Sequence, residues 1–236
     1  MALYTLEAAK SCVRNRDGRR VFYLGPEDRL TDAARDYLRE QGIDLLPAAQ
    51  AKPECYRTLS GAVLAEKPEH MTHLHGNVLV PKDHPRIAFR GKIDTLEAEL
   101  LLAQKDAREE RFPQADRDLG EILNFVRGLI RCDVLDEPLP PPVLCGLDGE
   151  ALRARSHDPA KFYGQPHFMP DASLPRTLLA LNRVRTAVRE TELACFAAFR
   201  DENGLPKRPD LLLGLNRLSS LLWILMIKMK GEHDGA

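Results

Sequence analysis

The stretch that decides the fold is "KIDTLEAELLLAQKDAREE", residues 92–110. Its apolar residues Ile93, Leu96, Leu100 and Ala103 recur at the three- and four-residue spacing that brings side chains to one face of an α-helix. Charged residues fill the positions between them. The stretch therefore predicts a long amphipathic helix that packs against other helices.

The same pattern recurs in three further stretches, at residues 115–135, 176–200 and 211–230. Two proline-bearing segments, "DEPLPPPVLCGLDG" and "SHDPAKFYGQPHFMPDASLP", cannot continue a helix and separate these stretches. The last helix is apolar on two faces, so we expect it at the centre of a bundle or at a subunit interface. The predicted fold class is mainly α, a four- or five-helix bundle.

Ahead of the helical part, the elements are short and mixed. "RRVFYLG" and "GIDLLP" predict two strands. Between them, "TDAARDYLREQG" predicts one helix, with Thr31 as its N-cap and Gly42 directly after its end. We therefore predict a small α/β-like extension of unknown role over residues 1–68 and a helical-bundle domain over residues 69–236.

The composition narrows the class of protein. The formal net charge of the 236 residues is -1, so nothing global points to nucleic acid. Five scattered cysteines without a C-x-x-C pair favour reduced thiols in a cytosol. The most apolar run, "LLWILMI", is far shorter than the roughly 20 residues of a membrane span. We expect a soluble cytoplasmic protein that binds neither nucleic acid nor a membrane.

The first candidate site is the cationic segment "VPKDHPRIAFRGK" at residues 80–92, expected as a loop that leads into the first long helix. It carries Lys82, Arg86, Arg90 and Lys92. Cations ahead of a helix, whose free amide groups also favour negative charge, fit a polyphosphate. A solvated charged turn produces the same pattern, and charge alone favours that alternative. The segment has no P-loop motif.

The second candidate is a polar stripe on the third long helix. Asn182, Arg185, Arg189 and Glu192 are spaced so that they share one face. An ordinary solvent face would have this spacing too. The last helix, however, places Asn216 inside a strongly apolar pattern, where a polar group needs a partner. Two such helices side by side predict a polar seam in an apolar bundle.

The third candidate is the histidine group His70, His73 and His75. Three close histidines can hold a metal, but this spacing is loose and no cysteine is near. Ordinary surface or hydrogen-bonded histidines are the simpler interpretation, so we predict no metal site.

The fourth candidate is the loop "FYGQPHFMP", with Phe162, Tyr163 and Phe168. Aromatic residues in an irregular segment usually anchor it to a core. A lid over a flat ligand is the alternative.

Together these stretches resemble a corrinoid adenosyltransferase. "MTHLHGNVLVPKDHPRIAFRGKIDTLEAEL" is similar to the ethanolamine-utilization branch of that family, with its H-P-R-I-x-F-R-G-K-[LI]-D pattern. "VRTAVRETE" and "LNRLSSLLWIL" are similar to A-R-T-V-C-R-R-A-E and L-N-R-L-S-D-x-L-F of the propanediol-utilization branch. "HFMP" is similar to its F-x-L-P-G-G segment. The resemblance covers residues 70–230 in matching order.

The chain also departs from these patterns. The glycine-rich T-x-x-G-D-x-G-x-T start is replaced by "EHMTHL", and the P-G-G turn is "PDA". The final aspartate of R-L-S-D is Ser220. The His-x11-Cys-Cys-x2-Cys metal motif of some ethanolamine-type members is absent, because the chain has no Cys-Cys pair.

The resemblance implies a role for the cationic segment and for its helix. Lys82 and Arg86 match the part of the family that grips the ATP triphosphate. Asp94 matches an acid that pairs with an arginine of the neighbouring subunit, and Arg185 matches that arginine. The resemblance gives no role to Arg90 and Lys92, which we expect to be solvated.

The resemblance likewise implies roles for the polar stripe and the aromatic loop. Arg189 matches an arginine on the phosphates, and Glu192 and Asn216 match the polar residues that complete the ATP pocket. Phe168 matches the aromatic residue that displaces the lower ligand of cobalt. Asp94, Arg185 and Arg189 are thus the implied catalytic residues, and Phe168 the implied cobalamin contact.

The implied reaction is the attack of Co(I) on the ribose 5′ carbon of ATP, with a polyphosphate as the leaving group. Its substrates are ATP with Mg²⁺ and cobalamin, and its product supplies ethanolamine breakdown. The implied assembly is a homo-oligomer with the site between subunits, and we favour a trimer over a dimer. An electron-donating reductase is its implied partner. Association with a bacterial microcompartment is the alternative to a free cytoplasmic enzyme. A non-enzymatic helical module that binds cobalamin or docks a partner is the competing hypothesis.

Overall fold

The computed structural model of the chain describes residues 2–16, 18–48 and 55–234. It divides into two compact units: Met1–Arg57 with Gly61–Glu66, and Thr58–Ser60 with Lys67–Ala236. The assignment of separate roles to residues 1–68 and 69–236 stays a prediction. The fold class is confirmed, because long packed helices dominate the described chain and small sheets lie in its N-terminal part.

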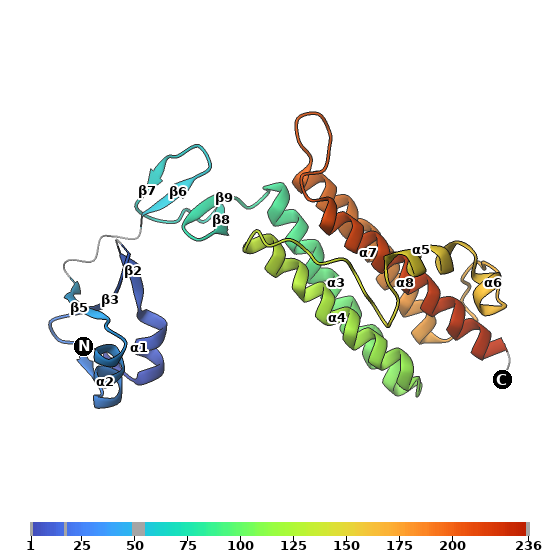
Figure 1. Ribbon diagram of the computed structural model, residues 1–236, viewed down its shortest axis with the longest axis horizontal. Helices are drawn as coiled ribbons and strands as arrows, with labels where there is room; N and C mark the ends of the chain where they lie inside the picture. The colour runs from blue at the N-terminus through green and yellow to red at the C-terminus, as the bar shows by residue number, and fades with distance from the viewer. Residues whose placement is uncertain (1, 17, 49–54, 235–236) are drawn as a thin grey trace. The chain divides into compact units, whose positions relative to one another are not determined.

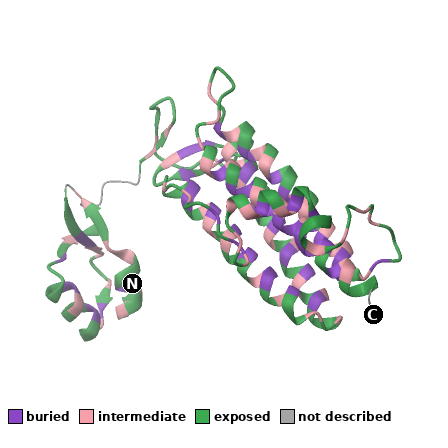
Figure 2. Cartoon of the chain, turned by 45° about the vertical axis from the view of Figure 1, so that its right-hand side comes forward, coloured by how far each residue is buried: buried purple, intermediate pink, exposed green. Residues whose placement is uncertain are grey.

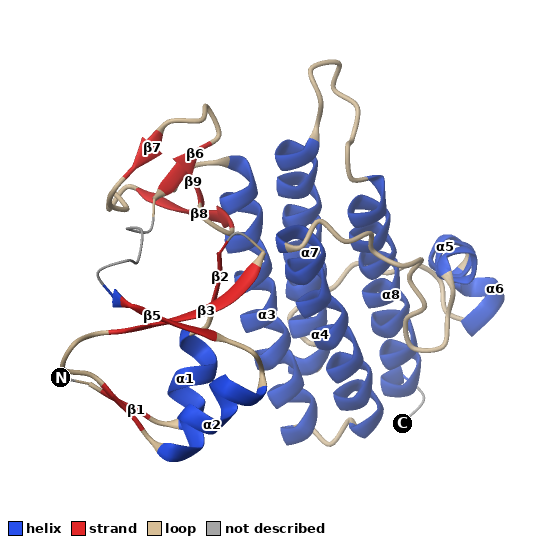
Figure 3. Ribbon diagram, turned by 60° about the vertical axis from the view of Figure 1, so that its left-hand side comes forward, coloured by secondary structure: helices blue, strands red, loops and turns tan. Residues whose placement is uncertain are grey.

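The first unit is a small α/β arrangement, seen in Figure 3. Strand β3 pairs in parallel with β5 and antiparallel with β2, while β1 pairs with β4. Its core holds Phe22 of β3 and Leu38 of α2, both fully buried. Its elements are β1 Leu3–Tyr4, α1 Leu6–Cys12, β2 Arg14–Arg16, β3 Arg19–Leu24, β4 Arg29–Leu30, α2 Asp32–Glu40, β5 Asp44–Pro47 and the β6–β7 pair Tyr56–Thr58 and Val63–Leu64.

The sequence predicted β3, α2 and β5, and all three are confirmed. Helix α2 begins as expected, because the Thr31 hydroxyl accepts a hydrogen bond from the amide of Ala34 at 3.3 Å. It ends before Gly42, whose φ of 60° is a left-handed conformation that suits glycine.

Four long helices make up the bundle of the second unit: α3 Pro85–Glu109, α4 Pro113–Val134, α7 Arg176–Phe199 and α8 Pro209–Asp234. Helix α3 packs against both α4 and α7, and α7 packs against α8. Ion pairs from Lys92 to Glu190 and from Arg176 to Asp106 show that α3 and α7 run antiparallel. Buried positions gather along the helices (Figure 2), including the predicted Ile93, Leu96, Leu100 and Ala103.

Helix α3 begins earlier than the sequence suggested. Residues 85–92 were expected as part of a loop, but Pro85 is the first residue of α3. The Nδ1 atom of His84 accepts a hydrogen bond from the amide of Arg86 at 3.2 Å, which caps the helix, and proline suits the first position. Arg86, Arg90 and Lys92 therefore lie on the helix itself.

The segment ahead of α3 is an antiparallel hairpin, which the sequence analysis did not predict. It comprises β8 Met71–His75 and β9 Val78–Pro81, with Gly76 at a φ of 48° in the turn. Met71, Leu74, Leu79 and Val80 are its buried residues. Leu79 and Val80 are adjacent and both buried, so the segment lacks the strict alternation of apolar and polar residues that predicts a strand.

Between α4 and α7 the chain is irregular except for α5 Gly149–His157 and α6 Pro159–Tyr163, which pack against α8. Helix α7 lacks a side-chain cap of its own. The Glu110 carboxylate, from the α3–α4 turn, accepts hydrogen bonds from the amides of Arg176 at 3.2 Å and Thr177 at 2.8 Å. This carboxylate therefore supplies the cap from another part of the chain.

By length and composition alone, α8 could cross a membrane. However, 56% of its most apolar window is buried inside the protein. A core helix of a bundle passes the same test, and we interpret α8 as one. The prediction that the last helix is central agrees with this burial.

Candidate functional site

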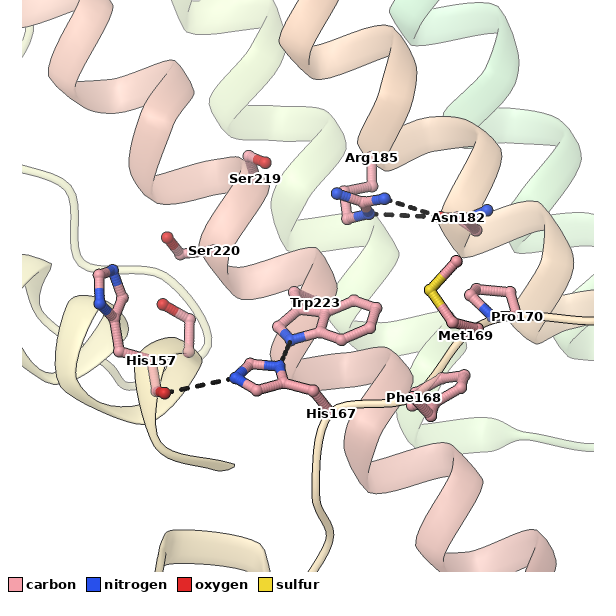
Figure 4. A pocket seen from close by; sticks show the side chains of 11 residues that line it. His157, His167, Phe168, Met169, Pro170, Asn182, Arg185, Ser219, Ser220 and Trp223 are labelled. Atoms are coloured by element: carbon pink, nitrogen blue, oxygen red, sulfur yellow. Dashed lines mark hydrogen bonds between the residues drawn. The ribbon is translucent and has the colours of Figure 1, made fainter. Parts of the chain in front are cut away.

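The main pocket of the bundle lies between α7, α8, the end of α5 and the loop that follows α6, and its volume is about 580 Å³ (Figure 4). This volume is in the range of ligand sites. Apolar side chains and a few polar groups converge on it, as ligand sites require. It is lined by Ser156, His157, His167, Phe168, Met169, Pro170, Asn182, Arg185, Ser219, Ser220 and Trp223.

Trp223 of α8 contacts two other residues of this pocket, Phe168 and Arg185. The Phe168 ring stacks on it, with 5.2 Å between centroids and 17° between planes. The guanidinium of Arg185 lies over the same indole, 5.4 Å from the ring centroid. The structure therefore brings the predicted residues Phe168 and Arg185 into one pocket, with an indole in contact with both.

Arg185 is a half-buried cation without a carboxylate partner in the described chain. Its Nε and Nη2 atoms donate to the Oδ1 atom of Asn182 at 3.3 and 3.1 Å. Burial lowers the pKa of Arg185, and the nearby charge of Arg189 lowers it further. Arg189 is exposed and has no ion-pair partner among the residues that the structure describes. The two arginines repel each other and would both be stabilised by an anion.

The polar stripe of α7 continues to Glu192, which joins it to α8. The Nδ2 atom of Asn216 donates to the Oε1 atom of Glu192 at 3.1 Å. The Oδ1 atom of Asn216 accepts from Arg217 at 2.7 Å. The predicted seam between these two helices is therefore present, and Arg185, Arg189 and Glu192 follow one face of α7 toward Asn216.

The cations at the start of α3 have a different environment. The Nε atom of Arg86 donates to Asp133 at 2.8 Å, and the Nε atom of Arg90 donates to the same carboxylate at 2.5 Å. Asp133 is fully buried. Arg90 also donates to the carbonyl oxygens of His73 and Leu74, in strand β8. The expectation that Arg90 is solvated is wrong, because its side chain is only 16% exposed.

Lys82 and Lys92, in contrast, remain near solvent. Lys82 pairs with Glu69 at 3.0 Å, and Lys92 pairs with Glu190 at 2.7 Å. Both are exposed pairs that an incoming anion can displace at small cost. The segment is therefore neither a plain solvated turn nor a set of free cations, since each of its predicted cations has a carboxylate partner.

Asp94 lies one turn further along α3 than Arg90. It is exposed and has no hydrogen-bond or ion-pair partner within the described chain. It does not line the pocket that holds Arg185. Among the described residues, Asp94 on α3 and Arg185 and Arg189 on α7 are thus left without an ion-pair partner.

Comparisons with known proteins fit this geometry. The sequence profile described as "Cobalamin adenosyltransferase" matches residues 63–135 and 163–229. The "Corrinoid adenosyltransferase EutT" of Salmonella typhimurium is 32% identical over 214 residues, which cover 91% of this chain and 78% of that protein. The protein with the same description from Escherichia coli is 32% identical over 228 residues, 87% of this chain and 84% of that protein.

The chain belongs to the cobalamin adenosyltransferase family. It is therefore an enzyme that adenosylates a corrinoid, and the family implies ATP and a corrinoid as its substrates. The resemblance stated from the sequence is confirmed, and so is the similarity to the ethanolamine-utilization type. Apart from Ser156 and His157, the residues that line the pocket around Trp223 lie within the matched residues, as do both groups of cations.

This adenosyltransferase offers poor donors for a resident metal in the described residues. They contain no group of three or more His, Cys, Asp or Glu side chains placed to hold an ion. Burial raises the pKa of the Cys145 and Cys195 thiols to about 12, which disfavours the thiolates that bind metals. His73 and His75 lie in β8, an element of the hairpin ahead of α3.

Sequence reasoning missed two features of this adenosyltransferase. Trp223 was given no role, although it is the single tryptophan of the chain and is the third residue after "LNRLSS". The burial of Asp133 was not predicted, because an acidic residue near the end of a helix is usually exposed. Its partners Arg86 and Arg90 are more than forty residues away in the sequence.

Proposed function

We propose that this adenosyltransferase transfers the 5′-deoxyadenosyl group of MgATP to cob(I)alamin at the pocket of α7 and α8. The observation that carries the proposal is the pair Arg185 and Arg189, which has no carboxylate partner in the described chain. A polyphosphate leaving group develops negative charge as the Co–C bond forms. Fixed cations aimed at it stabilise the transition state.

The residues divide into a nucleotide side and a corrinoid side. Arg189 is proposed to bind the phosphates, with Lys82 exchanging Glu69 for them. Glu192 and Asn216, already joined by a hydrogen bond, are proposed to contact the nucleoside. Phe168 is proposed to cover the lower face of the corrinoid, where an apolar ring excludes a ligand to cobalt. Magnesium enters with ATP.

Arg86 receives a second possible role from the structure. Its Nε and Nη2 donors are engaged by Asp133, which leaves little of the guanidinium for phosphate. The phosphate contact implied by the resemblance stays a prediction. The structural alternative is that Arg86 and Arg90 hold the β8–β9 hairpin, and with it the segment that bears Lys82.

We propose that the working enzyme is a homo-oligomer in which Asp94 of one subunit pairs with Arg185 of its neighbour. Neither group has an ion-pair partner among the residues that the structure describes, which supports this arrangement. A trimer is favoured over a dimer by the resemblance to the propanediol type. An electron-donating reductase would supply Co(I), and the product would serve ethanolamine breakdown in the cytoplasm, with a bacterial microcompartment as an alternative place.

The activity itself is tested anaerobically with MgATP and chemically reduced cobalamin. The expected result is the absorbance change of Co–C bond formation. Cobalamin binding without this change would support the competing hypothesis of a non-enzymatic module.

The shared site is tested by mixing two inactive variants. Asp94→Ala and Arg185→Ala should each lose most activity, because each leaves a charge unpaired at the site. Their co-expression should restore part of the activity, since some interfaces would then carry both native residues. Two variants that stay inactive together, although they co-purify, would contradict the intersubunit pair. An Asp94→Ala variant with normal turnover would also contradict it.

A further inference from the structure

The contact between Trp223 and His167 has no role in the proposed chemistry. The Nε1 atom of Trp223 donates a hydrogen bond to the Nδ1 atom of His167 at 3.0 Å. The two rings are nearly parallel, with 16° between their planes. His167 directly precedes Phe168 in the chain, so this bond fixes the backbone of the loop next to the residue proposed to meet the corrinoid (Figure 4).

The direction of this hydrogen bond defines the protonation of His167. The indole nitrogen of tryptophan can only donate, so Nδ1 must be the acceptor and carries no proton. The other ring nitrogen, Nε2, lies 3.3 Å from the carbonyl oxygen of His157, at the end of α5. In the neutral ring Nε2 carries the proton and donates to that oxygen. His167 thereby links α5, the loop before α7, and α8.

Trp223 also contacts the nucleotide side of the pocket. The Arg185 guanidinium lies over its ring, in the geometry of a cation–π contact. One indole therefore bonds the loop through its N–H group, stacks on Phe168, and supports Arg185 through its ring.

We propose that Trp223 and His167 form a positioning pair that holds Phe168 and Arg185 in fixed relation to each other. The inference rests on the proposed function, in which these two residues serve the corrinoid and the nucleotide. The hydrogen bond sets the loop and Phe168, and the indole ring sets Arg185. Neither Trp223 nor His167 takes part in the bond changes of the reaction.

The two functions of Trp223 are separable by substitution. Trp223→Phe keeps an aromatic ring but loses the N–H donor. It should raise the KM for cob(I)alamin about fivefold, the size of one net hydrogen bond, with a smaller change in the KM for MgATP. Trp223→Leu removes the ring too and should raise the KM for MgATP as well, because Arg185 loses its support.

A double-mutant cycle tests the bond itself. His167→Ala should match Trp223→Phe in its effect on the KM for cob(I)alamin. The double variant should be no worse than either single one, since each removes the same bond. His167→Asn retains an acceptor near the Nδ1 position and should recover most of the loss. His233→Ala, at an exposed position near the end of α8, is the matched control and should behave as the unchanged protein.

Trp223 provides its own spectroscopic signal. It is the only tryptophan in the chain, so the tryptophan fluorescence of the purified enzyme reports this pocket alone. Cobalamin, a strong absorber, should quench that emission on binding. In His167→Ala the emission of the free enzyme should shift to the red, because the loop no longer shields the indole from water.

The outcomes separate the two proposals. If bound cobalamin quenches the Trp223 emission but the effects of the two single substitutions on the KM multiply in the double variant, the positioning pair is overturned. The proposed location of the corrinoid is then still supported. Unchanged kinetics in both single variants would lead to the same conclusions. Absence of quenching by bound cobalamin would overturn the proposed location of the corrinoid, and the inference with it. Quenching, non-additive losses and recovery by His167→Asn together are the result that we expect.

Discussion

Two pairs of arginines on neighbouring helices have opposite environments. Arg86 and Arg90, at the start of α3, share the buried carboxylate of Asp133. Arg185 and Arg189, on α7, have no carboxylate partner within the described chain. Both pairs are spaced four residues apart on a helix. The difference shows that neither the residue type nor the spacing decides whether an arginine is paired within the chain, and we propose that the unpaired arginines of α7 serve the site.

The largest effect that we expect is on stability, from Asp133→Ala. Removal of this carboxylate leaves two largely buried guanidinium groups without their counter-ion, which should cost about 3–5 kcal/mol in the free energy of unfolding. Denaturant unfolding followed by circular dichroism measures it. Asp83→Ala removes an exposed acid directly ahead of α3; it is the control and should change stability by less than about 0.5 kcal/mol. Equal stability of the two variants would contradict the claim that Asp133 stabilises the fold through Arg86 and Arg90.

The next largest effect should be on activity, from Arg189→Ala. Loss of a cation aimed at the leaving group should lower kcat/KM for MgATP by about 10²–10³-fold. Thermal stability should stay nearly unchanged, because Arg189 has no ion-pair partner to lose among the described residues. Arg153→Ala, which removes an exposed arginine of α5, should keep full activity. A melting temperature that falls together with activity would show that Arg189 stabilises the fold, as Arg86 and Arg90 do.

A third largely buried arginine, Arg208, extends the comparison to the dependence of stability on pH. It pairs with Asp210 at 2.7 Å, where burial tends to raise the carboxyl pKa but hydrogen bonds from Arg208 and Leu139 lower it to about 2. Because the folded pKa lies below the ordinary value of 3.8, this stabilisation is complete above about pH 4 and is lost as pH falls toward about 2.

The loss should be on the order of 1–2 kcal/mol, reduced by solvent screening. Denaturant unfolding as a function of pH measures it. Asp210→Asn should be less stable at neutral pH and lose less stability in acid than the unchanged enzyme. A variant with the same acid dependence as the unchanged enzyme would refute this assignment.

The smallest effect that we expect concerns Lys82, which has a carboxylate partner but lies near solvent. Its partner Glu69 is 97% exposed, so the pair contributes little to stability. If Lys82 exchanges Glu69 for phosphate, Glu69→Gln should lower the KM for MgATP by about two- to threefold, since the competitor is gone. Steady-state kinetics measure this change, and Glu66→Gln is a nearby control. An unchanged or raised KM would argue against the exchange.

The long helices were predictable from the sequence because each buries an apolar stripe at helical spacing. Ile93, Leu96 and Leu100 show this directly, as all three are buried. The polar seam was predictable for a related reason, since Asn216 within an apolar pattern needs a partner and finds Glu192. Local spacing carries this kind of information.

The environment of each arginine was not predictable, because it depends on contacts between distant segments. Nothing near Arg90 in the sequence reveals Asp133 or the carbonyl oxygens of β8. The Trp223–His167 bond likewise joins residues 56 positions apart. The hairpin before α3 was missed because its strands are short and its histidines suggested another interpretation.

The Glu110 carboxylate has a consequence for the order of folding. Helices α3 and α4 form one local hairpin, and α7 and α8 form another, separated by an irregular crossover. The carboxylate of Glu110, at the turn of the first hairpin, accepts hydrogen bonds from Arg176 and Thr177, at the start of the second. These bonds can therefore form only when the two hairpins dock. A carboxylate in the first hairpin thus completes the start of the helix that bears Arg185 and Arg189, so this helix reaches its full set of backbone hydrogen bonds only in the docked bundle.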